Sequence, residues 1–348
     1  MEESVGKKFS CNSCGAALEF APGLSKLKCP YCAAASEIGV SEDEVQELSL
    51  DEWLDKFASE SETEVHTSIT CAPCGAISNI ENTSLSHCPF CGSQLMGNAR
   101  PLRLMKPKSL LPFKIKQGEA TEEYRRWINS LWFAPNKLKR FAENQATGIK
   151  GMYIPYWTFD STSVTTYTGK RGKTYRDSRG SSQTNWTSVN GTVRNSFHNI
   201  PAPATKSLPV KLVEKLEPWD LEELTAYQDE FLSGFQSEAY SVDLRQGYTV
   251  GKAKMEEIIR STIFSDIGGN EQRITTMNPV FTPFTFKHVL LPVWINSYRF
   301  GDRSFRYLVN GRTGEVQGER PWSAWKIAAL VAVIVFIFGV IMYFYLSN

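Results

Sequence analysis

The sequence IAALVAVIVFIFGVIMYFYL at positions 327–346 contains no charged residue. At about 1.5 Å of rise per residue, a helix of this length is roughly 30 Å long, which matches the hydrocarbon core of a bilayer. A buried core helix is the alternative, but the segment offers no polar face. It is flanked by residues typical of membrane interfaces: Trp322, Trp325, Lys326, Tyr343 and Tyr345. Residues 322–348 are therefore expected to form a C-terminal transmembrane anchor.

The charges around this segment predict its orientation. Arg312, Arg320 and Lys326 precede it, whereas only Ser347 and Asn348 follow it. Basic residues favour the cytoplasmic side of a membrane. The first eight residues are polar and mixed in charge, unlike a signal peptide. We therefore expect a single-pass protein of the cytoplasmic membrane with its N-terminal body in the cytoplasm.

All eight cysteines lie in the first 91 residues, as four C-x-x-C pairs. Fourteen residues separate the first two pairs, and thirteen separate the next two. Each pair is expected to form a turn that directs two sulfurs toward one ion, so two pairs complete a tetrahedral zinc site. Four thiolates leave no position for water, so both Zn²⁺ ions would be structural. The predicted ligands are Cys11, Cys14, Cys29 and Cys32, then Cys71, Cys74, Cys88 and Cys91.

The pairing within these two zinc ribbons has an open alternative, in which the ribbons exchange C-x-x-C pairs. Gly15, Gly75 and Gly92 each follow a cysteine where a left-handed backbone conformation is needed. Disulfides or a thioredoxin-like redox site are disfavoured by the ribbon spacing and by the expected cytoplasmic location. The second ribbon repeats the first after about sixty residues, which indicates an internal duplication.

The charge of the chain is unevenly distributed, although its net charge is only +1. Residues 1–99 carry 5 Lys+Arg and 15 Asp+Glu, whereas residues 100–180 carry 17 and 6. Because phosphate binding depends on Lys and Arg, the acidic ribbons are unlike a nucleic-acid-binding module. The basic segment could face anionic lipid, neutralise the acidic ribbons, or be a solvated surface.

The sequence predicts an α+β fold with a largely antiparallel sheet. Strands are expected at 152–167, 187–197, 289–295 and 298–309, and helices at 120–132, 136–145, 220–235 and 252–264. Pro155 and Trp157 match Pro292 and Trp294, which hints at a second duplication. The expected organisation is a first ribbon at 1–36, an acidic amphipathic helical linker at 37–65, a second ribbon at 66–97, a membrane-proximal domain at 98–321 and the anchor at 322–348.

Catalytic arrangements are scarce, so no enzyme activity is expected. The triplet Gly172-Lys173-Thr174 does not fit a phosphate-binding loop, because Tyr167 stands where that motif needs a glycine. Asp160 and Asp266 have no identifiable acid–base partner. The four histidines show no metal-ligand spacing and are expected to be structural: His66, His87, His198 and His288.

Six segments together resemble a bacterial family of tail-anchored zinc-ribbon membrane proteins typified by YdjG. They are WFAP at 132–135, YIPYWTFD at 153–160, EPWD at 217–220, DIGG at 266–269, KHVLLPVW at 287–294 and VNGRTGEVQGERP at 309–321. The resemblance implies a role in bringing a PspA-like phage-shock protein, which acts in envelope stress, to the bacterial cytoplasmic membrane. Family members are also labelled as primosomal or helicase relatives, but this chain has no helicase motor motif.

These observations lead to three functional hypotheses. The first is a non-enzymatic membrane adaptor whose ribbons and acidic linker dock partner proteins, including the PspA-like protein. The second is a membrane-tethered nucleic-acid-binding protein that uses the basic segment with its aromatic residues. The third is a membrane-bound enzyme that uses the α+β domain.

Overall fold

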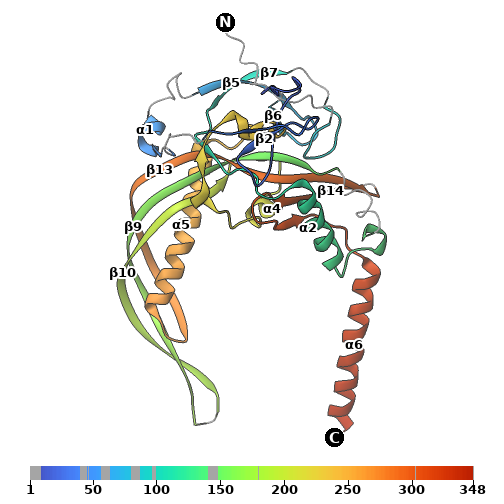
Figure 1. Cartoon of the computed structure of the whole chain (residues 1–348). Helices are drawn as coiled ribbons and strands as arrows, with labels where there is room; N and C mark the ends of the chain where they lie inside the picture. The colour runs from blue at the N-terminus through green and yellow to red at the C-terminus, as the bar shows by residue number, and fades with distance from the viewer. Residues whose placement is uncertain are drawn as a thin grey trace.

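The computed structural model describes residues 9–39, 45, 47–55, 63–79, 87–95, 99–139, 148–178, 180–301 and 303–347. Figure 1 shows two small β-units at one end of the molecule, near the N-terminus. A long curved sheet and a single long helix, α6 (Ala324–Ser347), both extend from the body toward the opposite end. The fold is mixed, with mostly antiparallel sheets, as the sequence predicted.

Three very long strands form the centre of the fold: β9 (Lys150–Arg176), β10 (Ser182–Pro203) and β13 (Glu271–Phe300). Two further strands, β14 (Arg303–Asn310) and β15 (Val316–Gly318), complete the order β10-β9-β13-β14-β15. All four of these pairings are antiparallel. The strands predicted at 152–167, 187–197 and 289–295 are confirmed as parts of much longer strands, whereas the segment 298–309 is divided near Gly301 between β13 and β14.

The apolar run at the start of β9 is covered on both faces, because successive side chains of a strand point to opposite sides. Tyr153 belongs to the same buried cluster as Phe20 of the first ribbon. Its neighbours Met152 and Ile154 belong to the cluster that contains Phe90 of the second ribbon. One ribbon therefore packs on each face of this part of the sheet.

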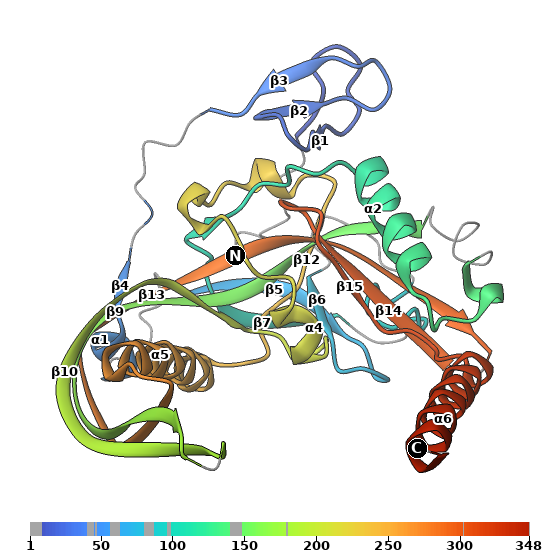
Figure 2. The same cartoon turned by 90° about the horizontal axis from the view of Figure 1, so that it is seen from below.

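The first ribbon contains a small sheet of β1 (Glu19–Phe20), β2 (Lys26–Lys28) and β3 (Ala35–Glu37). The second contains β5 (Thr63–Thr70), β6 (Ile77–Asn79) and β7 (Arg100–Met105), in the order β6-β5-β7. Because β7 pairs with β5, the second ribbon's sheet recruits residues that follow its last cysteine. Figure 2 shows the two units on different sides of the central sheet.

Beyond the ribbons, the central sheet continues as a curved extension that we call the leg. It consists of residues 160–176 of β9 with the paired parts of β10 and β13, and α5 (Leu244–Ile267) lies in its concave face. A buried row along α5 faces the sheet: Gly247, Gly251, Met255, Ile259, Ile263 and Ile267. The predicted helix at 252–264 is therefore confirmed and extends further at its N-terminal end.

The remaining elements are short, apart from α2 (Gln117–Ser130), which confirms the helix expected at 120–132. They are β4 (Leu48–Ser49), α1 (Leu50–Asp55), β8 (Ser109–Leu110), α4 (Val210–Glu214), η3 (Leu221–Glu223), β11 (Thr225–Ala226), η4 (Asp229–Leu232) and β12 (Gln236–Ser237). Of the helix expected at 136–145, residues 136–139 are helical and the others lie outside the described residues.

The helix expected at 220–235 is wrong. The segment forms two short 3₁₀ turns with β11 between them, and β11 pairs with β8. Phe231 contacts Phe20 of the first ribbon, with ring centroids 5.2 Å apart, and Gly234 has a φ of +83°. Tertiary contacts with the ribbon and the sheet therefore replace a continuous helix here.

The acidic linker contains a helix only over α1 within the part of 37–65 that the structure describes. Leu48 and Ser49 instead form β4, which pairs with β13. Trp53 of α1 packs edge-on against Phe286 of the sheet, with ring centroids 6.0 Å apart. Leu48, Leu50, Trp53 and Leu54 of the linker thus pack in the cluster that covers the central sheet. Positions 40–44, 46 and 56–62 of the linker lie outside the described residues.

Candidate metal centres and membrane helix

The eight cysteines form two separate clusters, each of which could hold a metal ion. In each cluster the four sulfurs all lie within 4.8 Å of one another. The first cluster contains Cys11, Cys14, Cys29 and Cys32, and the second contains Cys71, Cys74, Cys88 and Cys91. Each ribbon therefore closes on itself, and the alternative in which C-x-x-C pairs are exchanged is excluded by the structure.

The shortest distances cross between the two C-x-x-C turns of each ribbon. In the first ribbon, the Sγ atoms of Cys11 and Cys32 are 3.5 Å apart, as are those of Cys14 and Cys29. In the second ribbon, the corresponding distances are both 3.6 Å. These separations are far too long for disulfide bonds, which are about 2.05 Å. They are close to the roughly 3.8 Å edge of a tetrahedron with metal–sulfur bonds of about 2.3 Å.

The same backbone turn recurs at all four C-x-x-C pairs. The amide of the residue four positions after the first cysteine donates to that cysteine's carbonyl, at 2.8 Å for Gly15 and Gly75 and 2.9 Å for Gly92. These glycines have φ values of +75°, +74° and +73°, so the predicted left-handed conformation is confirmed. The fourth turn makes the same bond with Ala33, whose φ is +60°. This alanine adopts a conformation that is unfavourable for a residue with a Cβ atom.

Hydrogen bonds and burial affect the thiols of both sites, and the two sites differ in how deeply their cysteines are buried. Backbone hydrogen bonds from Ser13 and Cys14 lower the pKa of Cys11 to about 6. In the second site, burial raises the pKa of Cys71 to about 11. Despite its burial, hydrogen bonds from Ser93 also lower the pKa of Cys91 in the second site to about 7, so each site contains a thiol that favours the thiolate. Cys14 and Cys32 of the first site are exposed, whereas Cys74 and Cys91 of the second site are half-buried.

The helix α6 is long and apolar enough to span a membrane, and none of its most apolar stretch is buried against the described body. Its base is held by the loop that follows α2. The ammonium of Lys326 donates to the carbonyls of Trp132 and Ala134, at 3.0 and 2.9 Å, and to Oδ1 of Asn136 at 2.8 Å. Trp132 is 78% exposed and Trp325 is 81% exposed. An aromatic surface therefore surrounds the point where the helix leaves the body.

Only part of the basic flank expected before this helix is accessible. Arg312 is buried and forms an ion pair with Asp220, with nitrogen and oxygen 3.0 Å apart. Arg320 lies over the ring of Trp322, 4.5 Å from its centroid. Arg312 therefore has a structural role in the body, and the predicted orientation rests on Arg320 and Lys326.

No partner of Asp160 could be identified from the sequence, but the structure shows one. The buried Lys287 lies 2.9 Å from Asp160 and 2.8 Å from Glu47, so one ammonium joins two carboxylates. The amide of Asn199 also donates to Asp160, at 2.9 Å. No local pattern links these three charged residues, which lie on β9, on β13 and next to β4. The ammonium of Lys287 neutralises both carboxylates, so these ion pairs hold the linker against the sheet.

The other candidate residues also have structural surroundings. The Tyr167 hydroxyl donates to Asp266 at 2.5 Å, where α5 meets the sheet. His288 packs against Trp157, with ring centroids 4.8 Å apart, and its burial lowers its pKa to about 4. Gly172-Lys173-Thr174 lies within β9, in a strand and not in the loop before a helix that the phosphate-binding motif requires. The other three histidines lie in separate places. His66 lies on β5, His87 forms an isolated β-bridge with Gln94, and His198 is exposed.

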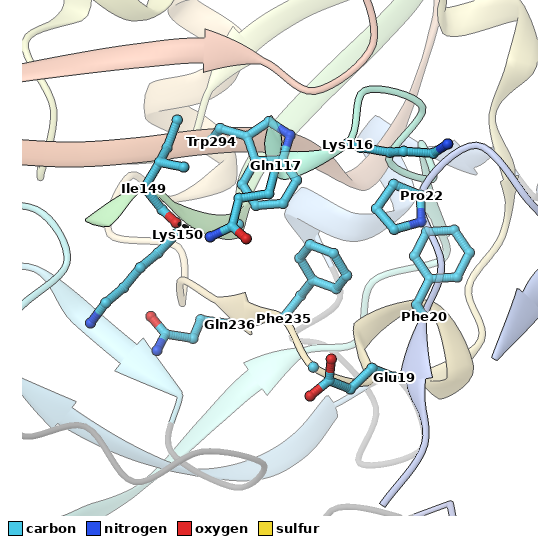
Figure 3. Close-up of a pocket in the computed structure, with 12 residues that line it drawn as sticks. Glu19, Phe20, Pro22, Lys116, Gln117, Ile149, Lys150, Phe235, Gln236 and Trp294 are labelled. Carbon is cyan, nitrogen blue, oxygen red and sulfur yellow. Dashed lines mark hydrogen bonds between the residues drawn. The ribbon is translucent and has the colours of Figure 1, made fainter. Parts of the chain in front are cut away.

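A cavity of about 360 Å³ lies between the first ribbon and the body (Figure 3). Its aromatic lining residues are Phe20, Phe235 and Trp294, and its charged lining residues are Glu19, Lys116 and Lys150. The side chain of Gln117 donates to the carbonyl of Ile149 at 2.8 Å. The residues that line this cavity include no pair of carboxylates and no nucleophile beside a base.

Comparison with known proteins gives one distant relative. No family model matches the chain, and no solved structure matches it. The relative is the uncharacterized protein YdjG of Bacillus subtilis (strain 168), which is 27% identical over 234 residues. The alignment covers 65% of this chain and 67% of the relative. The chain is therefore a distant homologue of YdjG that carries two four-cysteine clusters and one long apolar helix near its C-terminus.

Proposed function

We propose that this protein is a non-enzymatic, membrane-anchored adaptor whose two zinc ribbons dock partner proteins at the bacterial cytoplasmic membrane. The observation that supports it best is the combination of two closed four-cysteine clusters with an uncovered apolar helix in one chain. Zinc is the metal that we assign, because four thiolates at these separations suit tetrahedral Zn²⁺. Such sites have no open coordination position, so they would stabilise the ribbons without reacting.

The surface of the first ribbon supports a docking role. Tyr31, within the turn Cys29-Pro-Tyr-Cys32, is 83% exposed, and Leu24 is 55% exposed. Leu18, Phe20 and Leu27 of this ribbon are instead buried in a cluster that the ribbon shares with the body. Large exposed apolar side chains next to a rigid metal turn are a plausible anchor for a partner, because aromatic residues dominate the energetics of interfaces. The partner that we infer from the family resemblance is a PspA-like envelope-stress protein.

The proposal is tested with the full chain in its native membrane. Membranes are crosslinked and solubilised gently, and the captured proteins are identified by mass spectrometry. We expect a coiled-coil phage-shock protein and small membrane partners. The double variant L24S/Y31S should reduce capture of the phage-shock protein by tenfold or more, about 1.4 kcal/mol of lost binding.

The matched control is Val280→Ser, because Val280 is also exposed but lies in the middle of the leg, far along the chain from the ribbons. It should leave capture unchanged. Equal capture by L24S/Y31S and the unaltered protein would rule out docking through this surface. Recovery of nuclease-sensitive complexes or replication proteins instead would favour the nucleic-acid hypothesis.

A further inference from the structure

The leg and α6 extend from the same side of the body (Figure 1). Among the described residues, the leg is a three-stranded sheet with a free edge along β10 and another along residues 271–284 of β13, because β13 pairs with β4 only from Thr285 and with β14 only from Val293. Its helix α5 carries an exposed ion pair between Glu257 and Arg260. Open sheet edges and exposed charges are not tolerated in hydrocarbon. Figure 1 also shows the leg running beside α6 as far as the C-terminal end of the helix. If α6 spans a bilayer, as the proposed function requires, the leg must stay on the aqueous side, so the membrane-bound helix must be inclined away from the leg relative to the arrangement in Figure 1.

The far end of the leg is basic. We define the tip as residues 170–178, 180–187 and 266–273, where the described charged residues are five basic and three acidic. Each acidic side chain accepts a hydrogen bond within the tip or its base: Asp177 from the Ser181 amide, Glu271 from Thr184, and Asp266 from Tyr167. The exposed basic side chains are Lys170, Lys173, Arg176 and Arg273.

Two of these basic residues oppose each other directly. Lys170 of β9 and Arg273 of β13 are register partners in an antiparallel pair. Side chains at such positions are about 5 Å apart, and like charges there are destabilising. The folded state therefore carries a repulsion that an anionic partner would relieve.

An aromatic side chain completes this surface. Trp186 of β10 is the register partner of Gly172 on β9, and the guanidinium of Arg273 on β13 lies 4.2 Å from the Trp186 ring centroid. A Cβ at position 172 would lie 3.1 Å from the indole. Glycine therefore allows the indole to lie across β9 and reach the arginine of the third strand. Tyr175 stands exposed beyond it, near the turn.

We propose that the tip of the leg is a second membrane contact, which binds anionic lipid headgroups on the surface that α6 enters. Basic residues near such a surface each contribute about fivefold to the attraction, and tryptophan and tyrosine favour the interface. The basic side chains emerge on both faces of the sheet end, because Lys170 and Lys173 have opposite parity along β9. This arrangement suits end-on contact with a plane. The inference rests on the proposed membrane placement of α6.

The test uses the full chain, reconstituted into bilayers of phosphatidylcholine alone or with phosphatidylglycerol. A photoreactive amino acid replaces Tyr175 at the tip or, as a control position, Val280, which lies in the middle of the leg and is 63% exposed. We expect lipid crosslinks from position 175 only when phosphatidylglycerol is present, with a yield that falls at high salt. Position 280 should give none in either bilayer.

The charge requirement is tested by a fourfold glutamine variant of the tip residues Lys170, Lys173, Arg176 and Arg273. Its crosslink yield from position 175 should fall to the level seen with phosphatidylcholine alone. The control variant removes four exposed basic charges elsewhere: Arg194→Gln, Lys206→Gln, Lys211→Gln and Arg260→Gln. It should keep the full yield. Equal crosslink yields from both variants would overturn the proposal. So would equal yields in bilayers with and without phosphatidylglycerol.

Alkaline extraction of the same bilayers separates this inference from the proposed function. A chain that remains in the bilayer but gives no tip crosslinks would disprove the tip contact alone. A chain that alkali removes would disprove the membrane span and, with it, the placement on which the tip contact depends. Crosslinks from position 175 to nucleic acid in place of lipid would also contradict the inference.

Discussion

At the scale of single residues, Ala33 is a position where the Cβ atom disfavours the backbone conformation that the fold requires. It occupies the left-handed conformation that glycine occupies in the other three C-x-x-C turns. The left-handed conformation costs a residue with a Cβ about 1–2 kcal/mol. We predict that Ala33→Gly stabilises the metal-bound first ribbon by up to about 1 kcal/mol, measured by denaturant unfolding.

The control is Ala35→Gly, two residues further on. Ala35 is also exposed but lies in β3. Glycine in a strand costs about 0.5–1 kcal/mol relative to alanine, so this change should destabilise the ribbon. Destabilisation by both substitutions would contradict the strain that we assign to Ala33.

Glu238 is a buried carboxyl group at the junction of the second ribbon and the sheet. One of its oxygens accepts hydrogen bonds from Thr205, at 2.7 Å, and from Ser207. The amide of Ala239 donates to the Ile77 carbonyl of β6 at 2.9 Å. Burial raises the pKa of Glu238 to about 7. The folded protein therefore binds a proton here that the unfolded chain releases at lower pH.

We predict that this group makes the protein less stable as the pH rises from about 4.5 to about 7. A raised carboxyl pKa means that the folded state binds more protons in this window, so stability falls with pH. The total loss is about 3 kcal/mol. Glu238→Gln, which cannot ionise, should remove this part of the pH dependence, as measured by urea unfolding at several pH values. An unchanged profile in the variant would refute the assignment.

At the scale of elements, the close packing of α5 on the sheet depends on two glycines. A Cβ at Gly251 would lie 2.5 Å from a ring carbon of Phe159, and one at Gly247 would collide with Trp157. The helix thus lies close enough for the two aromatic rings to pack against its backbone. Overpacked cores typically lose 1–3 kcal/mol.

We therefore predict that Gly251→Ala lowers the free energy of unfolding by about 1–3 kcal/mol. The control is Gly118→Ala in α2, where a new Cβ meets nothing within 4 Å. Alanine is a better helix former than glycine, so this change should stabilise the protein by about 0.5–1 kcal/mol. Thermal or denaturant unfolding of both variants provides the comparison. Equal effects of the same sign would show that helix propensity, and not close packing, governs position 251.

The elements that the sequence predicted are those with strong local patterns. The cysteine spacing predicted both clusters, and the regular apolar positions of 252–264 predicted α5. The apolar run at 152–159 predicted a strand, but it did not predict that a different ribbon would cover each face. The local sequence of a strand does not specify which distant segment packs against it. The cluster of Asp160, Lys287 and Glu47 was missed for the same reason, since its members are separated by more than one hundred residues. The helix expected at 220–235 failed because Phe231 packs against the ribbon.

At the scale of the whole molecule, the metal sites are coupled to the body through its core. Cys11 and Cys29 share a buried cluster with Phe113, Tyr153 and Trp294 of the body. Cys71 and Cys88 share another with Leu111 and Met152. Loss of metal from either ribbon should therefore expose one face of the central sheet.

We predict that a chelator lowers the thermal stability of the body as well as of the ribbons. Structural zinc contributes directly to folding free energy, and the sheet would lose apolar cover on both faces. Near-ultraviolet circular dichroism reports the body, because Trp157, Trp219 and Trp294 lie outside the ribbons. Added Zn²⁺ should restore the original melting curve. A body transition that is unaffected by the chelator would show that the sheet is stable without its metal-bound covers.

The long pairing of β9 with β13 also has a consequence for the order of events during synthesis. Register partners such as Lys150 and Ile295 are far apart in the chain, so their contact is made only after most of the protein exists. Non-local strand pairing is slow to form. β15 ends at Gly318 and α6 begins at Ala324. The last strand of the sheet and the helix that would enter the membrane are therefore made almost together, so the sheet can close only at about the time that the helix becomes available to insert.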